Sequence, residues 1–112
     1  MRTVVRLLVG VVFMMSAQVA MAQKGDANAG KEPFTKTCAL CHGPDGNTPK
    51  ASVAKLLKVD IPQLGSSDAQ SKSDEEIKNI IMQGNKKMKP VKSLSEKDAY
   101  NVIAFVRTIK KP

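Results

Sequence analysis

The segment Cys38-Ala39-Leu40-Cys41-His42 constrains this chain more than any other, because it holds both cysteines and the single histidine. Two thiols separated by two residues lie on one side of a helical turn, where they can add to the two vinyl groups on one edge of a porphyrin. The next residue can then turn its imidazole toward the iron, for which neutral imidazole is a strong axial ligand. The spacing C-x-x-C-H is the pattern of covalent haem attachment. It predicts one haem c, with its iron, bound through Cys38 and Cys41, with His42 as axial ligand.

Two other kinds of site use the same residue types. Cysteines in an oxidising compartment usually form a disulfide, and a thioredoxin-like redox pair is a related possibility. The chain lacks, however, the alternating strands and helices expected around a thioredoxin motif. A structural zinc site usually takes four protein ligands, and two cysteines with one histidine fall short of that number. The motif favours haem attachment over both alternatives.

The N-terminal residues have the three parts of a secretory signal peptide. A start with two arginines is followed by an apolar run over residues 7–17 and by a small-x-small cleavage site over residues 20–22. The apolar run is shorter than the about 20 residues of a spanning helix, and an uncleaved membrane anchor is the alternative. We therefore expect residues 1–22 to be removed. Residues 23–112 should form one periplasmic haem domain without a stable membrane span.

The composition gives an independent reason to expect a large cofactor. The chain has 112 residues, of which only 4% are aromatic, and it contains no Trp. Domains of this size are marginally stable and often depend on a metal, on disulfides or on a bound partner. A large apolar cofactor would supply the interior that these side chains do not.

Hydrophobic periodicity predicts an all-α domain, and the pattern is clearest near the C-terminus. Ser95 can cap a helix that runs to about Ile109, with apolar residues at helical spacing. Ser73 can cap another helix, which Gly84 would end in a left-handed conformation. No window alternates convincingly as a strand.

The N-terminal half is less regular. Asp26 can cap a helix over residues 27–37, in which Pro33 either introduces a kink or is the first helical residue. A short helix is expected over residues 51–58. So much of the rest reads as loop that the loops are expected to wrap a cofactor: residues 43–49, 59–72 and 85–94.

At these residues the sequence resembles the class I c-type cytochromes, which are monohaem electron carriers with an all-helical cytochrome c fold. Further anchors are Gly30 and Phe34, which precede Cys38, the stretch Cys-His-Gly-Pro-Asp-Gly, and a Met-containing loop before the last helix. The resemblance implies about three to five short helices wrapped around one haem. It also implies that Gly30 and Phe34 pack against a face of the last helix formed by Val102, Phe105 and Val106.

The second axial ligand is sought among the methionines, because His42 is the only histidine and a bis-His site within the chain is impossible. Four of the six methionines belong to the expected signal peptide, which leaves Met82 and Met88. Met82 lies among the isoleucines of a predicted helix, where core packing is its ordinary role. Met88 lies in the loop that such cytochromes use, so the resemblance favours Met88, with a lysine, a water or an open position as alternatives. Unlike the usual family pattern, Lys89 separates the methionine from Pro90.

The surroundings of the haem are less well specified. A proximal histidine normally donates its other ring nitrogen to a carbonyl, and the resemblance implies a downstream loop proline, for which Pro49 is the better candidate and Pro44 the poorer one. Tyr100 could bond a haem propionate, although packing between helices is its simpler role. The candidate walls of the haem pocket are apolar: Val53, Leu56, Leu57, Ile61, Leu64, Ile81 and Val91.

These features predict an electron-transfer protein and not an enzyme. A haem iron with His and Met ligands is closed to substrates, and Met ligation in an apolar shell favours the ferrous state. The prediction is a periplasmic electron carrier that cycles one haem iron between Fe(II) and Fe(III). The alternatives are an electron-transfer subunit of a larger oxidoreductase, and a haem enzyme or gas-binding sensor with a labile sixth ligand.

The formal net charge of +8 indicates a kind of partner. Lys86, Lys87, Lys89 and Lys92 cluster around Met88, where positive charge would steer acidic redox protein partners and speed their encounter at low salt. An ordinary solvated surface is the alternative. Nucleic-acid binding is not expected of an exported chain without an aromatic platform, and we expect a monomer.

Overall fold

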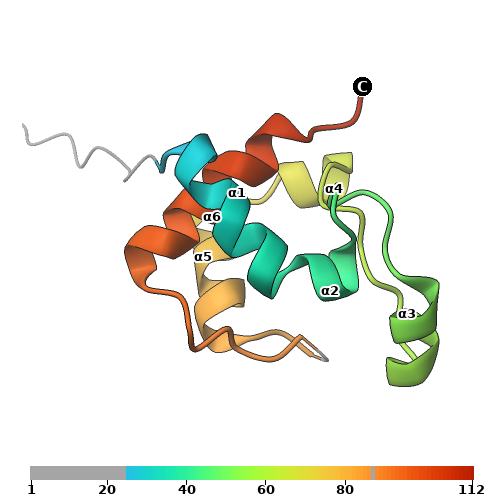
Figure 1. Cartoon of the computed structure of the whole chain (residues 1–112). Helices are drawn as coiled ribbons and strands as arrows, with labels where there is room; N and C mark the ends of the chain where they lie inside the picture. Colours follow the sequence, from blue (N-terminus) through green and yellow to red (C-terminus); the bar gives the residue numbers. More distant parts are fainter. Residues whose placement is uncertain (1–24, 87) are drawn as a thin grey trace, which may run out of the picture.

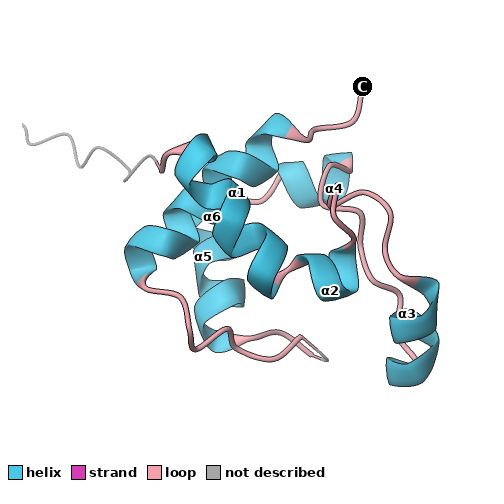
Figure 2. Ribbon diagram, viewed as in Figure 1, coloured by secondary structure: helices cyan, strands magenta, loops and turns pink. Residues whose placement is uncertain are grey.

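A computed structural model of the protein describes residues 25–86 and 88–112, and most of these residues are helical (Figures 1 and 2). No strand occurs in the described residues, and the all-α prediction is confirmed. The expected signal peptide, residues 1–22, lies outside them. In chain order the helices are α1 (Ala27–Thr37), α2 (Ala39–His42), α3 (Ala51–Leu57), α4 (Ser67–Gln70), α5 (Asp74–Gln83) and α6 (Glu96–Thr108).

The helices α1 and α6 cross each other and make the most extensive packing contact in the molecule (Figure 1). Gly30 of α1 lies directly on the backbone of α6, where an added Cβ would collide with the carbonyl oxygen of Asn101. Phe34, one turn further along, is fully buried, and its ring centroid lies 4.9 Å from that of Phe105. The predicted packing of Gly30 and Phe34 against the last helix is confirmed.

Both C-terminal helices begin at their predicted caps. The N–H of Asp98 donates to Ser95 Oγ, and the N–H of Ser95 donates to Asp98 Oδ2, which completes a capping box at α6. Ser73 Oγ accepts from the N–H of Glu76 at the start of α5. Gly84 ends α5 with a φ of 81°, but its ψ of 169° lies outside the left-handed helical region. A glycine stop is therefore confirmed, with a different geometry from the expected one.

The helix α1 runs through Pro33, so the prediction that it could begin at this proline is wrong. Asp26 caps α1 with its carboxylate, as predicted. Pro33 donates no backbone hydrogen bond, but Gly30 and Phe34 are buried against α6 on either side of it. This packing keeps the helix continuous.

Two further helices, α3 and α4, are short. The helix α3 ends at Leu57, close to the predicted boundary, with Lys58 in a left-handed conformation, and none of its residues is buried. The helix α4 is a single turn, capped by Ser66, inside residues 59–72, for which the sequence predicts a loop. That prediction is wrong at α4, because one turn is too short to produce a periodic pattern.

The core lies mainly between α1, α5 and α6. It contains one cluster of buried apolar side chains, to which the C-x-x-C-H segment contributes two members. The buried members are Phe34, Cys38, Ala39, Ile81, Leu94, Ala99, Val102, Ile103 and Val106.

Candidate functional site

The two cysteines lie on one helical turn directly after α1. The N–H of Cys38 donates to the carbonyl of Phe34 at 2.8 Å, and the N–H of His42 donates to the carbonyl of Cys38 at 3.0 Å. Both thiols are free; Cys38 is buried and Cys41 is half-buried. Leu40, between them, is 66% exposed. The turn therefore directs its first cysteine into the protein and its central leucine into solvent.

Cys38 is held in its neutral form. Burial raises the pKa of the Cys38 thiol, and a hydrogen bond with Thr37 Oγ1, 3.4 Å from the sulfur, partly opposes this rise. The neighbouring Cys41 raises the pKa further, because two thiolates would repel each other. At neutral pH Cys38 is accordingly a protonated, weakly polar side chain of the core, unlike the exposed thiolate of a redox cysteine.

One hydrogen bond orients the imidazole of His42. The ring is buried, and its Nδ1 lies 3.1 Å from the carbonyl oxygen of Pro62. Because a carbonyl can only accept, Nδ1 carries the proton and Nε2 keeps a free lone pair. Burial lowers the pKa of His42, while the Pro62 carbonyl opposes this shift by favouring the protonated ring. The result is a neutral imidazole with one nitrogen available to a metal.

Pro62 supplies this carbonyl, so the predictions of Pro49 and Pro44 are wrong. Both predicted residues lie in the loop after α2, which bonds to the backbone of the motif and to the C-terminal end of α6. Pro62 follows His42 by 20 residues. No local pattern connects residues at that separation, and the only signal was the general expectation that a loop proline would be the partner.

Met88 lies in a tight loop after α5. Met88 and Asn85 exchange two backbone hydrogen bonds, each of 2.9 Å. Gly84 permits this turn, because its φ is +81° and an added Cβ would lie 2.8 Å from the carbonyl oxygen of Met88. The N–H of Val91 then donates to the carbonyl of Ile81 at 2.8 Å. The loop that carries the predicted ligand is thus closed onto the end of α5.

The two candidate methionines share the same core. Met82 and Met88 are both partly buried, and both pack against the cluster between α1, α5 and α6. Met82 belongs to α5, where packing is sufficient to explain it. Met88 is followed by the exposed residues Lys89 and Pro90. Burial alone does not separate the two sulfurs, so the assignment of Met88 stays a prediction.

A match to a protein family decides what kind of protein has this geometry. The model of the family described as cytochrome C oxidase, cbb3-type, subunit III, matches residues 25–106. The chain belongs to this family. It is a small c-type cytochrome with the cytochrome c fold, an electron-transfer role and covalently bound haem c. Among curated proteins, no sequence matches the cytochrome significantly.

The solved structures that are similar to this cytochrome include the following two. One is the KustC0563 c-type cytochrome, at 28% sequence identity and a TM-score of 0.62, with 73% of this chain and 98% of that chain covered. The other belongs to the Kuenenia stuttgartiensis reducing HAO-like protein complex Kustc0457/Kustc0458, at 22% identity and a TM-score of 0.62. That match covers 79% of this chain and 44% of that chain, so the cytochrome spans less than half of it and the likeness shows the fold alone.

The side chains of the attachment motif fit the haem c of a c-type cytochrome. Cys38 and Cys41 offer two free thiols on one turn, as two thioether bonds require. His42 follows immediately, and within the described residues its Nε2 makes no hydrogen bond that would compete with a metal. Cys38 and Cys41 would therefore hold the porphyrin, and His42 would hold its iron.

The predicted walls of the haem pocket fall into two groups. Ile81 is buried in the core, and Leu64 and Val91 pack against it, so these three stabilise the fold in any case. Val53 and Ile61 are half-buried. Two leucines of α3 lie outside the core with large exposed fractions, 80% for Leu56 and 37% for Leu57. The role of these residues as pocket walls stays a prediction.

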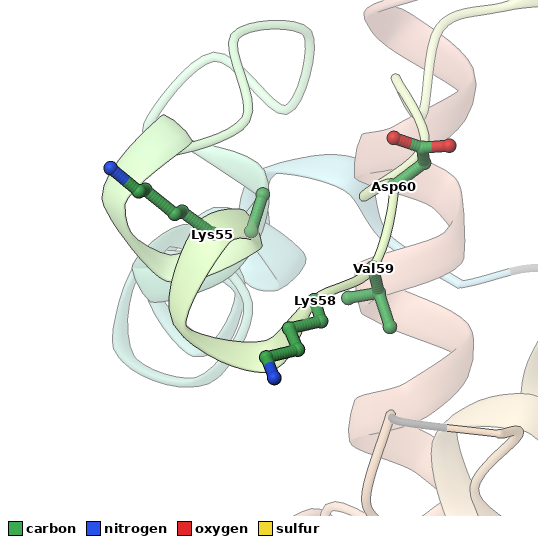
Figure 3. A pocket seen from close by; sticks show the side chains of 5 residues that line it. Lys55, Lys58, Val59 and Asp60 are labelled. Carbon is green, nitrogen blue, oxygen red and sulfur yellow. The ribbon is translucent and has the colours of Figure 1, made fainter.

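Among the open hollows on the surface of the described residues, two stand out. One, of about 350 Å³, lies at the end of α3, where Lys55, Lys58, Val59 and Asp60 surround it together with Ala54 (Figure 3). The other, of about 360 Å³, lies along α5 and the start of the following loop. None of the residues predicted to bind haem lines either hollow, so neither is the cofactor site.

The surroundings of the Met88 loop are basic. Lys86, Lys89 and Lys92 are exposed, and Lys87 lies outside the described residues. Tyr100 is partly buried against the core, which agrees with a packing role. In the part of the chain that the structure describes, no helix has both the length and the apolar character needed to cross a membrane.

Proposed function

We propose that this cytochrome is an exported electron carrier whose haem iron is held by His42 and Met88. The bound haem supplies one-electron chemistry, as its iron cycles between Fe(II) and Fe(III). The observation that carries the proposal is the pairing of two free thiols on one turn with a buried imidazole, which the Pro62 carbonyl presents with Nε2 unprotonated. These are the groups needed for covalent attachment and for the first axial bond.

The remaining side chains favour electron transfer over catalysis on a substrate. Met88 would fill the second axial position from a loop that is hydrogen-bonded to the end of α5. With His42 and Met88 both in place, the chain leaves no iron position open to a substrate or a gas. The same ligands in both oxidation states also keep the reorganisation around the iron small. A haem enzyme or gas sensor would need Met88 to be weakly bound or absent.

The proposed location is the periplasm, after removal of residues 1–22 and with residues 23–112 as the mature domain. Two arginines, an apolar run and a small-x-small site support this proposal. The exposed residues Lys86, Lys89 and Lys92 support a docking surface for an acidic redox protein. Attraction of this kind should weaken as salt rises, because added ions screen exposed charges.

An electron-transfer subunit of a larger oxidoreductase is the second candidate. The name of the family favours it, because the family is described as an oxidase subunit. The size of the native protein separates the two candidates. A carrier should purify as a monomer, whereas a subunit should copurify with larger chains.

The experiment that tests the proposal is a visible spectrum of the oxidised and reduced protein, together with its intact mass, from cells that mature c-type haems. We expect a mass without residues 1–22 and with one haem, and a spectrum that includes the iron–methionine charge-transfer band of the oxidised form. Unmodified thiols on the peptide around Cys38 and Cys41 would contradict the proposal. A haem adduct without that band would favour the enzyme or sensor.

A further inference from the structure

Two amide side chains hold the segment that supplies the carbonyl to His42. The peptide between Leu64 and Gly65 lies just after Pro62, outside regular secondary structure. Its N–H donates to Asn47 Oδ1 at 2.7 Å, and its carbonyl accepts from Gln70 Nε2 at 2.9 Å. The two side chains therefore hold a single peptide group at its donor and at its acceptor.

The same amides also bind the C-terminal end of α6. Asn47 Nδ2 donates to the carbonyl of Ile109 at 2.9 Å, and Gln70 Nε2 donates to the carbonyl of Val106 at 3.0 Å. Carbonyls at the end of a helix lack their usual partner four residues on. These bonds also determine how each amide is oriented, since its oxygen must face an N–H and its nitrogen a carbonyl.

Other contacts leave this peptide little freedom to move. The N–H of Leu64 donates to the carbonyl of Gly46 at 2.9 Å. Gly65 is buried, and a Cβ added to it would collide with a carbonyl oxygen at the end of α6. Arg107 of α6 in turn fixes Gln70, because its Nη1 donates to the Gln70 carbonyl at 2.8 Å. The segment is thus anchored to the most extensively packed helix of the protein.

We propose that Asn47 and Gln70 are positioning residues for His42. By holding the Leu64–Gly65 peptide, they place the Pro62 carbonyl at the distance at which it accepts the Nδ1 proton. Such a hydrogen bond makes the imidazole a stronger donor to a metal, and hydrogen bonding around the axial ligand is one of the means by which a protein sets the potential of a haem. The proposal rests on the proposed ligation of the haem by His42.

The test uses the haem-loaded protein and the variants Asn47→Ala and Gln70→Ala. Each variant removes one of the two amides and leaves His42 and Pro62 unchanged. The measurements are the reduction potential and, by NMR of the reduced protein with isotope-labelled histidine, the exchange of the Nδ1 proton with water. Both variants should exchange this proton severalfold faster. Both should also shift the redox equilibrium severalfold toward the reduced form. The reason is that an imidazole that donates less electron density to the iron stabilises the ferric state less.

Ser73→Ala is the matched control, since it removes the cap of α5 without touching either amide. It should lower the melting temperature while leaving the potential and the exchange of the histidine proton at their wild-type values. If the amide variants behave like Ser73→Ala, Asn47 and Gln70 only stabilise the fold and the proposal is wrong.

A substitute variant covers the case of poor folding, and the wild-type protein separates this proposal from the proposed function. If Asn47→Ala does not accumulate as folded protein, Asn47→Ser and Gln70→Ala carry the comparison. A wild-type protein without histidine-ligated haem would contradict the proposed function and this proposal together. If the wild-type protein has such a haem but neither variant changes its reduction potential, only the positioning role is contradicted.

Discussion

At the scale of a residue, burial and one hydrogen bond determine the protonation and the tautomer of the His42 imidazole. In water an imidazole titrates near pH 6.5, and its neutral form exchanges between two tautomers. In the folded chain, burial lowers the pKa, and the Pro62 carbonyl selects the tautomer with an unprotonated Nε2. The folded chain therefore holds His42 in the neutral tautomer that the predicted iron ligation requires.

The second ligand can be tested by replacing one methionine at a time. Met88→Ala should leave the haem attached through Cys38 and Cys41 but lower the reduction potential, because a thioether ligand favours ferrous iron. The variant should also bind added imidazole or cyanide, which spectra and redox titrations would show.

Met82→Ala is the control for this substitution, because Met82 has a similar burial and packs against the same core. Truncating Met82 should cost on the order of 2 kcal/mol of stability. It should leave the reduction potential unchanged and the iron still closed to added imidazole or cyanide. If Met82→Ala opens the iron to added ligands and Met88→Ala does not, the assignment is reversed.

At the scale of an element, the contact between α1 and α6 depends on a position that has no side chain. Gly30 allows the two backbones to approach, and Phe34 then fills the space beside the crossing with its ring against that of Phe105. Buried aromatic pairs of this kind contribute about 0.5–1.5 kcal/mol beyond their area. The crossing explains how α1 tolerates Pro33 in its interior.

Gly30→Ala should therefore destabilise the protein, although alanine favours a helix more than glycine does. The new Cβ would collide with the Asn101 carbonyl oxygen, so α1 would have to move away from α6. We expect a loss of about 1–3 kcal/mol, measured by denaturant unfolding. Lys31→Ala, at the exposed neighbouring position, should change stability by less than about 0.5 kcal/mol. A Gly30→Ala protein as stable as the wild type would show that the helices can separate freely.

At the scale of the whole molecule, the core is concentrated on one side. The apolar cluster joins α1, α5 and α6, whereas α3 buries none of its residues. Figure 1 shows α3 standing apart from the crossing of α1 and α6. The exposed leucines of α3 and the few aromatic residues are consistent with a domain that relies on its cofactor for stability.

Replacing both cysteines that are predicted to attach the haem, Cys38→Ala with Cys41→Ala, tests this dependence. The double variant should lose haem during purification and melt at a lower temperature, since a group that binds only the folded state stabilises it. In hydrogen exchange, α3 should lose protection first and α6 last. Met88→Ala is the comparison, because it should keep both thioether bonds and the colour. A colourless double variant with wild-type stability would contradict the prediction.

The sequence alone determined the features that depend on neighbouring residues. Cys38, Cys41 and His42 lie within one helical turn. The side chains of Ser95 and Ser73 each accept a hydrogen bond from the backbone N–H three residues later. These are local interactions, so residue order is enough to predict them. The all-α class followed in the same way, because helical periodicity repeats within a few residues.

Only the tertiary structure decided which distant groups meet. The carbonyl that accepts from His42 Nδ1 belongs to Pro62. The amides of Asn47 and Gln70 join the segment after Pro62 to the end of α6. Prolines and amides are common in loops, and no spacing marks the ones that will be used. The partners in these three bonds lie 20, 62 and 36 residues away along the chain. Such long-range geometry is set by the packing of the helices and not by the order of residues.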